Sequence, residues 1–155
     1  MTETDTPDQP LSAYSIWFGL IVAGWIADFL YPLPFMPGHI PPVSTGGIFI
    51  LVGFGLVALA LHEFRDADTR LETGFSIPIL VTRGVYRYSR NPIYFGLHVA
   101  LLGFAVAIDS LWVLAMLAPF HILVATSIVP REEAELERTF AELYLEYKSD
   151  VRRWL

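Results

Sequence analysis

Two groups of polar residues in this chain have the types and spacing that ligand binding at a membrane surface requires. The first lies in the segment Leu80–Gly96, where arginines, tyrosines, a serine and an asparagine stand directly before an apolar run. The second is the acidic pair Glu132 and Glu133, which follows another apolar run. Carboxylates bind cations, arginines bind carboxylates, and aromatic rings bind flat or cationic groups. These segments are therefore the candidates for a binding or catalytic site.

The residues at the end of the first group are spaced as one face of a helix. Asn91 is followed by a proline, which predicts a helix start with Asn as the N-cap and Pro at the first helical position. At roughly 100° per residue, Asn91 and His98 lie about 20° apart and Tyr94 lies about 60° from Asn91. Gly96 and Gly103 share the opposite stripe. We expect one face to meet a ligand and the other to pack on a neighbouring helix.

The composition indicates a small membrane protein. The chain has 155 residues, of which 54% are hydrophobic and 17% charged, whereas a soluble domain carries about 25% charged residues. It has no cysteine, which excludes disulfides, thiolate zinc sites, iron–sulfur clusters and a cysteine nucleophile. The net charge of −6 argues against a nucleic-acid partner.

The apolar runs predict an all-α integral membrane fold with four transmembrane helices. They cover roughly residues 11–31, 47–61, 93–108 and 111–129, and a span needs ~20 residues, with ~17 to 25 typical. Only Asp109 and Ser110 separate the last two runs, which predicts a tight hairpin. The single domain then consists of a disordered acidic tail (1–10), helices 1 and 2 (11–62), a loop (63–92), the hairpin (93–130) and a tail helix (131–155).

The distribution of positive charge predicts the orientation in the membrane. All ten Lys and Arg residues fall between residues 63 and 92 or after residue 130. Because cytoplasmic loops carry the Lys and Arg excess, we expect both termini on the cytoplasmic side of the inner (cytoplasmic) membrane.

The tail has the pattern of an amphipathic helix. Apolar residues recur there every three or four positions: Leu136, Phe140, Leu143, Tyr147, Val151 and Trp154. This pattern predicts one cytoplasmic helix over residues 131–155, with Glu132 and Glu133 in its first turn. Arg131 and Arg152 on this helix are candidates for binding a substrate.

Glycines in the second apolar run also match a nucleotide-binding pattern. The segment Gly53–Ala58 fits G-x-G-x-x-A, but that mechanism needs a strand before the glycines. Because these glycines lie inside one apolar helix, we interpret them as sites of close helix packing.

Four pieces of sequence occur in an order that resembles one superfamily of membrane enzymes. They are Leu80-Val81-Thr82 with Gly84-Val85-Tyr86, then Arg90–Gly96, then Glu132-Glu133, then Tyr144 and Tyr147 before Val151–Trp154. From about residue 64 to the end, the chain resembles the isoprenylcysteine carboxyl methyltransferase and phospholipid methyltransferase superfamily. The resemblance implies an integral membrane enzyme that uses S-adenosylmethionine, with neither a Rossmann fold nor a metal.

The resemblance also implies which residues hold the cofactor. The adenosine part would be lined by Pro78, Ile79, Leu80, Val81, Gly84 and Tyr86. The methionine end would be contacted by Asn91, Pro92, Ile93 and Tyr94, with Arg90 beside them. Either Glu132 or Glu133 would reach the amino group.

The expected reaction is in-line transfer of a methyl group to a lipid-like or amphipathic acceptor presented from the bilayer. A carboxylate acceptor needs no base, whereas an amine or thiol must lose a proton. The candidates for that catalytic role are Glu133, Tyr94 and His98. The superfamily's arginine about one turn before the acidic pair is replaced by Ile128 and Val129, so a prenylcysteine acceptor is not expected.

Two other functions are compatible with the sequence. One is a membrane reductase that uses NADPH, since sterol reductases resemble the C-terminal half of this chain. The other is a four-helix membrane protein without enzymatic activity. The concentration of polar residues at one membrane face favours the methyltransferase.

Overall fold

The computed structural model describes residues 13–69 and 79–155, so Pro78 lies outside the described residues. Within these ranges the chain is helical and contains no strand. The elements are α1 (Ala13–Leu30), α2 (Pro42–Thr69), the 3₁₀ turn η1 (Gly84–Arg87), α3 (Pro92–Ala107), α4 (Leu111–Ala115), α5 (Leu117–Leu123), the π-helical segment η2 (Val124–Ile128), α6 (Val129–Phe140) and α7 (Glu142–Asp150).

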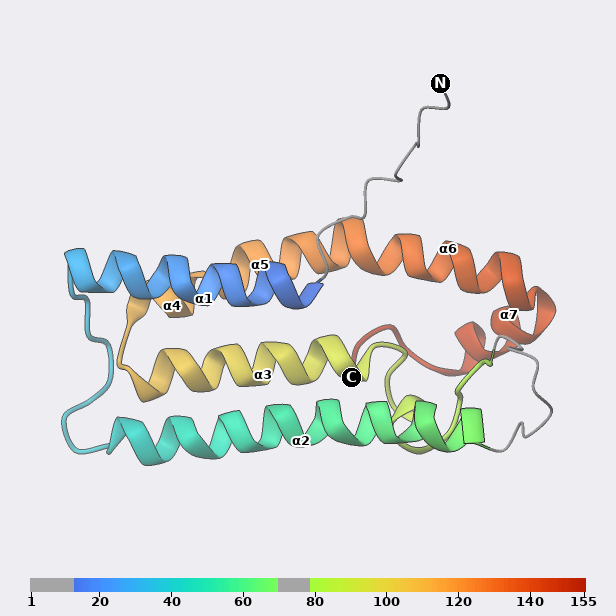
Figure 1. The fold of residues 1–155 in the computed structure, drawn as a ribbon, viewed down its shortest axis with the longest axis horizontal. Coiled ribbons are helices and arrows are strands. Elements are labelled where there is room, and N and C mark those ends of the chain that lie inside the picture. Colours follow the sequence, from blue (N-terminus) through green and yellow to red (C-terminus); the bar gives the residue numbers. More distant parts are fainter. Residues whose placement is uncertain (1–12, 70–78) are drawn as a thin grey trace, which may run out of the picture.

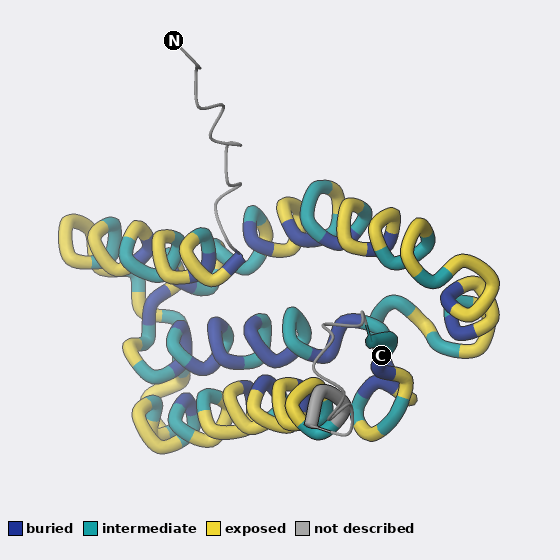
Figure 2. The backbone as a smooth tube through the Cα atoms, turned by 45° about the vertical axis from the view of Figure 1, so that its right-hand side comes forward, coloured by how far each residue is buried: buried dark blue, intermediate teal, exposed yellow. Residues whose placement is uncertain are grey.

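The long helices form two layers, and the two members of each layer run antiparallel to each other (Figure 1). One layer contains α1 and the nearly continuous rod from α4 to α6, and the other contains α2 and α3. Helix α3 is the most enclosed of them, and the outer faces of α1 and α2 are exposed (Figure 2). The order of the helices therefore brings the loop before α3 and the segment after α5 to the same end of the bundle.

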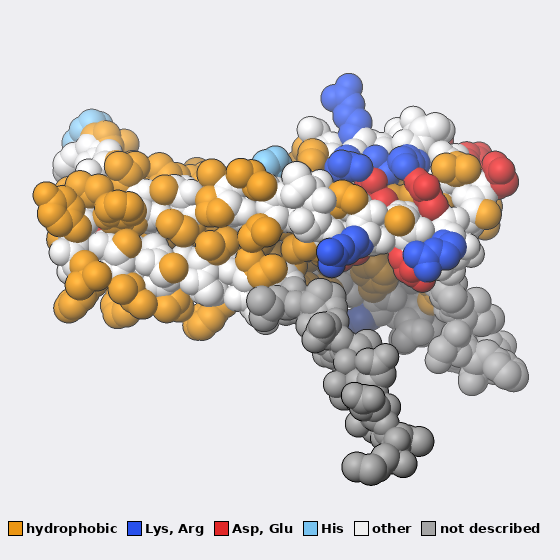
Figure 3. Space-filling view, turned by 90° about the horizontal axis from the view of Figure 1, so that it is seen from above, with side chains coloured by type: hydrophobic (Ala, Val, Ile, Leu, Met, Phe, Trp, Pro, Cys, Tyr) orange, Lys and Arg blue, Asp and Glu red, His pale blue; other side chains and the backbone are white. Residues whose placement is uncertain are grey.

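Three helical stretches are long and apolar enough to cross a membrane: Ala13–Leu30, Pro42–Asp66 and Leu111–Phe140. Their outward side chains are large and apolar, such as Phe29 at 77% and Leu51 at 76% exposed. Figure 3 shows apolar side chains along most of the molecule and charged side chains gathered at the end formed by α6 and α7. This arrangement identifies an integral membrane protein.

Helix α3 is the shortest of the four expected spans. It has 16 residues, and at about 1.5 Å per residue it is about 24 Å long, compared with about 30 Å for a hydrocarbon core. The turn that joins it to α4 lies at Asp109–Ser110, as the sequence predicted. The Asp109 Oδ1 atom accepts hydrogen bonds from the backbone N–H groups of Phe35 (2.8 Å) and Met36 (2.7 Å). These bonds fix the hairpin to the loop between α1 and α2.

Glycines allow α2 and α3 to approach each other at backbone distance. A Cβ atom on Gly53 would lie 2.5 Å from the Ala100 backbone N and 2.6 Å from the Gly96 carbonyl oxygen. A Cβ atom on Gly103 would lie 2.6 Å from the Ile50 backbone N. The structure thus confirms close packing at Gly53, and the stripe of Gly96 and Gly103 faces the neighbouring helix.

We expect Gly53→Ala to destabilise the protein by about 1–3 kcal/mol, the usual cost of an overpacked core. Gly55→Ala is the matched control, because a Cβ atom there meets nothing within 4 Å and alanine is favoured over glycine in helices by about 1 kcal/mol. Thermal unfolding of both variants in detergent, followed by circular dichroism, measures the difference. Equal melting temperatures for the two variants would contradict the packing argument.

The fourth apolar helix does not end at Pro130. Proline cannot donate the backbone hydrogen bond and its ring clashes with the carbonyl one turn earlier. Here the π-helical segment Val124–Ile128 directly precedes that turn, and the helical stretch continues through Pro130 to Phe140. The acidic pair therefore lies at the start of α6, with Glu132 in its first turn, and α6 continues the fourth apolar helix.

The prediction of a single tail helix over residues 131–155 is wrong. The tail forms α6 and α7, which are separated at Ala141 with a φ of 47°, and the chain leaves the helical conformation at Val151. A positive φ is unfavourable for a residue with a Cβ atom, and no glycine or proline near Ala141 signals the break. The second helix also differs, because it continues to Thr69 where a loop was expected from residue 63.

Candidate functional site

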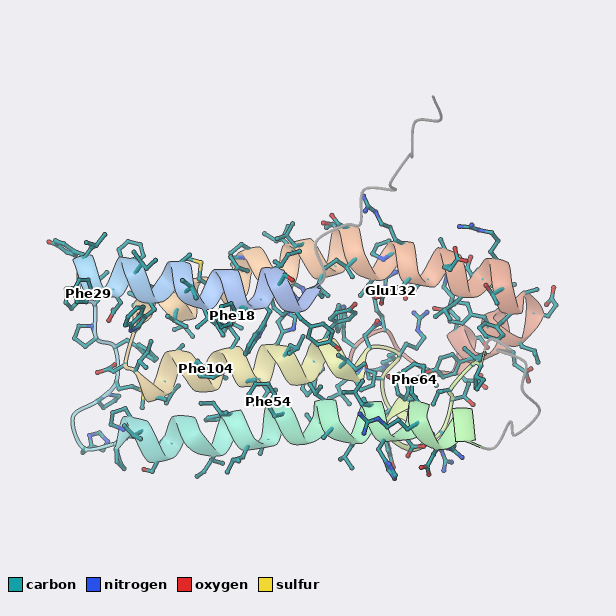
Figure 4. The ribbon with its side chains drawn as sticks, viewed as in Figure 1. Phe18, Phe29, Phe54, Phe64, Phe104 and Glu132 are labelled. Carbon is teal, nitrogen blue, oxygen red and sulfur yellow. The ribbon has the colours of Figure 1, made fainter. Side chains whose placement is uncertain are left out.

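A cavity of about 440 Å³ lies at the charged end of the bundle. It is lined by residues from α1, α2, α3, α6, α7 and the loop before α3. In Figure 4, Glu132 on α6 and Phe64 on α2 point toward the space between the two layers, and both line this cavity. Segments that are far apart in the sequence thus meet around one space.

Most of the residues proposed from the sequence to bind the cofactor line this cavity. They are Ile79, Leu80, Val81, Tyr86, Arg90, Asn91, Pro92, Ile93, Tyr94, Glu132 and Glu133. Gly84 does not line it, and Pro78 falls outside the described residues. The candidate substrate-binding residues Arg131 and Arg152 are exposed and also lie outside the lining.

Sequence reasoning missed several lining residues. They are Tyr14, Phe64, Glu135, Leu136, Tyr144 and Tyr147. The amphipathic pattern of the tail contained Leu136 and Tyr147, and the resemblance included Tyr144 and Tyr147, but neither predicted that these side chains line a ligand site. Tyr14 and Phe64 come from α1 and α2, and only the tertiary arrangement brings them to the cavity.

Glu133 is held by two arginines. Its side chain is 8% exposed, and it accepts hydrogen bonds from Arg153 Nε (3.0 Å) and Arg153 Nη2 (2.7 Å). Arg90 Nη1 lies 3.1 Å from Glu133 Oε1 and also donates to the hydroxyl of Tyr144 (3.2 Å). A buried carboxylate needs such compensation. Its lone pairs are therefore engaged inside the protein.

Glu132 has different partners. It accepts a hydrogen bond of 2.5 Å from the hydroxyl of Tyr94. Among residues 13–69 and 79–155, no arginine or lysine forms an ion pair with it. Of the acidic pair, Glu132 is consequently the carboxylate whose negative charge is available to a ligand.

The spacing of buried residues changes along this helix before the two carboxylates. From Phe120 onward its buried residues are Phe120, Val124, Val129 and Glu133, with steps of four, five and four residues. The step of five spans the π-helical segment, which adds one residue to a turn. After this segment Glu133 lies on the buried face, whereas Glu132 is exposed.

The loop before α3 is held against α2 by a charged contact. Gly84 has a φ of 58°, and a Cβ atom there would lie 2.0 Å from Glu63 Oε1. Arg83 Nε lies 2.9 Å from Glu63 Oε2. Gly84 therefore shapes the loop instead of lining the cavity, and only glycine combines this backbone conformation with so close an approach.

Helix α7 also contacts the loop before α3. The hydroxyl of Tyr147 donates to the carbonyl of Tyr86 (2.7 Å). Burial raises the pKa of Tyr147 to about 12, so the phenol keeps its proton and this hydrogen bond at neutral pH. Burial also raises the pKa of Tyr86 well above its usual value. Both tyrosines enter the cavity wall as neutral aromatic groups.

His98 lies away from the cavity lining, one turn beyond Tyr94. Its Nδ1 atom is 2.7 Å from the carbonyl oxygen of Tyr94, and its ring packs against Phe120, His121 and Trp154. In the described part of the chain, no three His, Asp or Glu side chains are grouped as metal ligands.

Comparison with known proteins gives one finding. No curated protein and no solved structure matches the chain. A family model described as phospholipid methyltransferase matches residues 42–143, which is more than half of the chain and includes α2, α3, the acidic pair and the loop that lines the cavity. The chain therefore belongs to the phospholipid methyltransferase family, a family of membrane methyltransferases.

Proposed function

We propose that this protein transfers a methyl group from S-adenosylmethionine to a lipid-like or amphipathic acceptor. The observation that carries the proposal is the cavity in which an unpaired carboxylate, a buried arginine and aromatic walls meet. The family match supports a membrane methyltransferase and lipid-like substrates. The volume of the cavity, about 440 Å³, is within the range of small-molecule sites, roughly 300–1,000 Å³.

The residues present fit this cofactor. Glu132 suits its ammonium group, because a carboxylate without a cationic partner gains most from binding one. Arg90 Nε is a buried donor with no hydrogen-bond partner among the described residues, which suits the cofactor's carboxylate. The apolar segment at Ile79, Leu80 and Val81, with the Tyr86 ring, suits the adenine.

Catalysis would come mainly from orientation. The cofactor supplies an electrophilic methyl group on its sulfonium, and holding two reactants in attack geometry contributes ~7 to 11 kcal/mol. Of the candidates named from the sequence, Glu133 is engaged by two arginines and His98 lies outside the cavity lining. The Tyr94 hydroxyl donates a hydrogen bond to Glu132, so its oxygen can accept a hydrogen bond from an N–H or O–H of the acceptor. We therefore assign Tyr94 the role of orienting the acceptor.

The proposed topology has four spans, with both termini and the cavity on the cytoplasmic side of the inner membrane. Two facts support it: all Lys and Arg residues fall in two segments of the sequence, and Figure 3 shows charges gathered at one end. Arg131 and Arg152 are exposed, and we propose that they attract an anionic group of the acceptor.

Calorimetry on detergent-purified protein tests the function. We expect S-adenosylmethionine to bind and NADPH not to bind. Binding of NADPH alone would favour a membrane reductase, and binding of neither would favour a protein without this enzymatic activity. Transfer of a labelled methyl group into a membrane lipid extract, followed by identification of the labelled species, then identifies the acceptor and the atom methylated.

A further inference from the structure

The C-terminal segment 151–155 packs against the loop before α3, which lines the cavity. Figure 1 shows the C-terminus beside the start of α3. The backbone N–H of Arg90 donates to the carbonyl of Arg152 (3.0 Å). The carbonyl of Arg153 accepts from Ser89 Oγ (3.1 Å) and from Asn91 Nδ2 (3.1 Å). The tail is thus bound through its own backbone to the loop that carries Arg90.

Asn91 gives an independent indication that this contact is built into the fold. Its position and type predict a helix N-cap, yet its side chain makes no capping hydrogen bond. Instead, the amide donates to the tail, and the Asn91 backbone N–H is satisfied by Ser89 Oγ (3.2 Å). Asn91, the residue directly before α3, therefore holds the C-terminal segment in place.

The side chain of Arg153 determines the charge next to the cavity. It binds both oxygens of Glu133 in a bidentate pair, the strongest geometry for an arginine and a carboxylate. With Arg90 included, this cluster of two arginines and one carboxylate has a net charge of +1. Without Arg153 the cluster would be neutral, and both Glu133 oxygens would be free to compete for Arg90.

We propose that Arg153 is a positioning residue for the cofactor, because it neutralises Glu133 and leaves Arg90 able to bind the cofactor's carboxylate. The inference rests on the proposed function. It assigns a role to a residue beyond the matched range 42–143, so the family match says nothing about it. The amino-acid end of the cofactor would then meet a positive cluster at Arg90 and a negative group at Glu132.

Two ligands separate this role from a general structural one. S-adenosylmethionine has the charged amino-acid end, whereas methylthioadenosine has the same nucleoside with a neutral thioether in place of the sulfonium and no amino-acid end. We expect Arg153→Gln to raise the Kd and the KM of S-adenosylmethionine at least tenfold, with little change in kcat. The Kd of methylthioadenosine should stay within twofold of wild type. Arg153→Lys keeps the charge but loses the bidentate geometry, and its Kd for S-adenosylmethionine should be intermediate.

Matched variants control for loss of structure. Arg87→Gln removes an exposed arginine near the same loop and should bind both ligands as wild type does. Removing Leu155, which is 64% exposed, should also change neither affinity. Removing residues 153–155 deletes the carbonyl contacts as well and should weaken both ligands.

The outcomes that overturn the proposal are distinct from a failure of the proposed function. If Arg153→Gln weakens both ligands equally, or leaves the S-adenosylmethionine affinity unchanged, Arg153 is not a positioning residue. If Arg153→Gln does not fold, the Lys variant decides: equal loss of both ligands there also refutes the role. If wild-type protein binds no S-adenosylmethionine, the proposed function itself fails.

Discussion

Glu132→Gln lowers the affinity for S-adenosylmethionine on the order of 100-fold, which corresponds to about 2.7 kcal/mol. The substitution leaves the shape of the side chain unchanged, and the amide oxygen can still accept the hydrogen bond from Tyr94. What it removes is the negative charge that the described cations leave unpaired. The Glu132 side chain is exposed, and a hydrogen bond to a charged group contributes about 1.5–3 kcal/mol, a range that includes this value.

Calorimetry with S-adenosylmethionine and with methylthioadenosine measures this effect. Methylthioadenosine has no ammonium group, so its affinity should not change. Glu137→Gln is the matched control on the same helix, because Glu137 pairs with Lys148 on the surface and does not line the cavity. If Glu132→Gln binds S-adenosylmethionine as tightly as wild type, the assignment of Glu132 to the ammonium is refuted.

Glu133→Gln, in contrast, is expected to act mainly on stability. It leaves Arg90, whose side chain is 10% exposed, and Arg153 without their common counter-ion. Removing one partner of a buried ion pair costs about 3–5 kcal/mol, and the partial exposure of Arg153 places the effect near the lower value. For a chain of this size, about 3 kcal/mol corresponds to a decrease in Tm of about 6–12 °C.

Thermal unfolding in detergent checks this result against Glu137→Gln. The Glu137 pair is partly exposed, and exposed pairs contribute about 0–1 kcal/mol, so its Tm should stay close to that of wild type. Adding Arg153→Gln to Glu133→Gln removes one unpaired cation and should restore part of the loss. Equal Tm values for Glu133→Gln and Glu137→Gln would show that the arginine cluster does not need Glu133.

The adjacent carboxylates illustrate what periodicity alone predicts poorly. The sequence indicated that Glu132 or Glu133 faces the site. A regular helical period, however, does not show where a helical turn contains an extra residue. The π-helical segment Val124–Ile128 shifts the phase by one position. Only the structure shows that the arginines bind Glu133, whereas Glu132 accepts a hydrogen bond from Tyr94.

The helices themselves were predictable where the pattern was strong. Long apolar runs predicted α1, α2 and the fourth helix, because a chain of this composition must shield its backbone polar groups in lipid by forming helices. The Asp109–Ser110 turn was predictable because two polar residues separate two apolar runs. The packing of Gly53 was predictable because small residues allow helices in a membrane to approach closely. The end of α2 at Thr69 and the break at Ala141 were missed, since neither carries a glycine or proline that would signal it.

By itself, the sequence determined the membrane class, the cluster of charge at one end and the loop and acidic pair that form the site. These features depend on the composition and spacing of residues that lie close together in the sequence. Only the tertiary structure decided that Tyr14 and Phe64 line the cavity, that Arg153 binds Glu133 and that His98 lies outside the lining. Their positions depend on how antiparallel helices and the returning tail pack together, and such contacts between distant segments leave no periodic signal in a single chain.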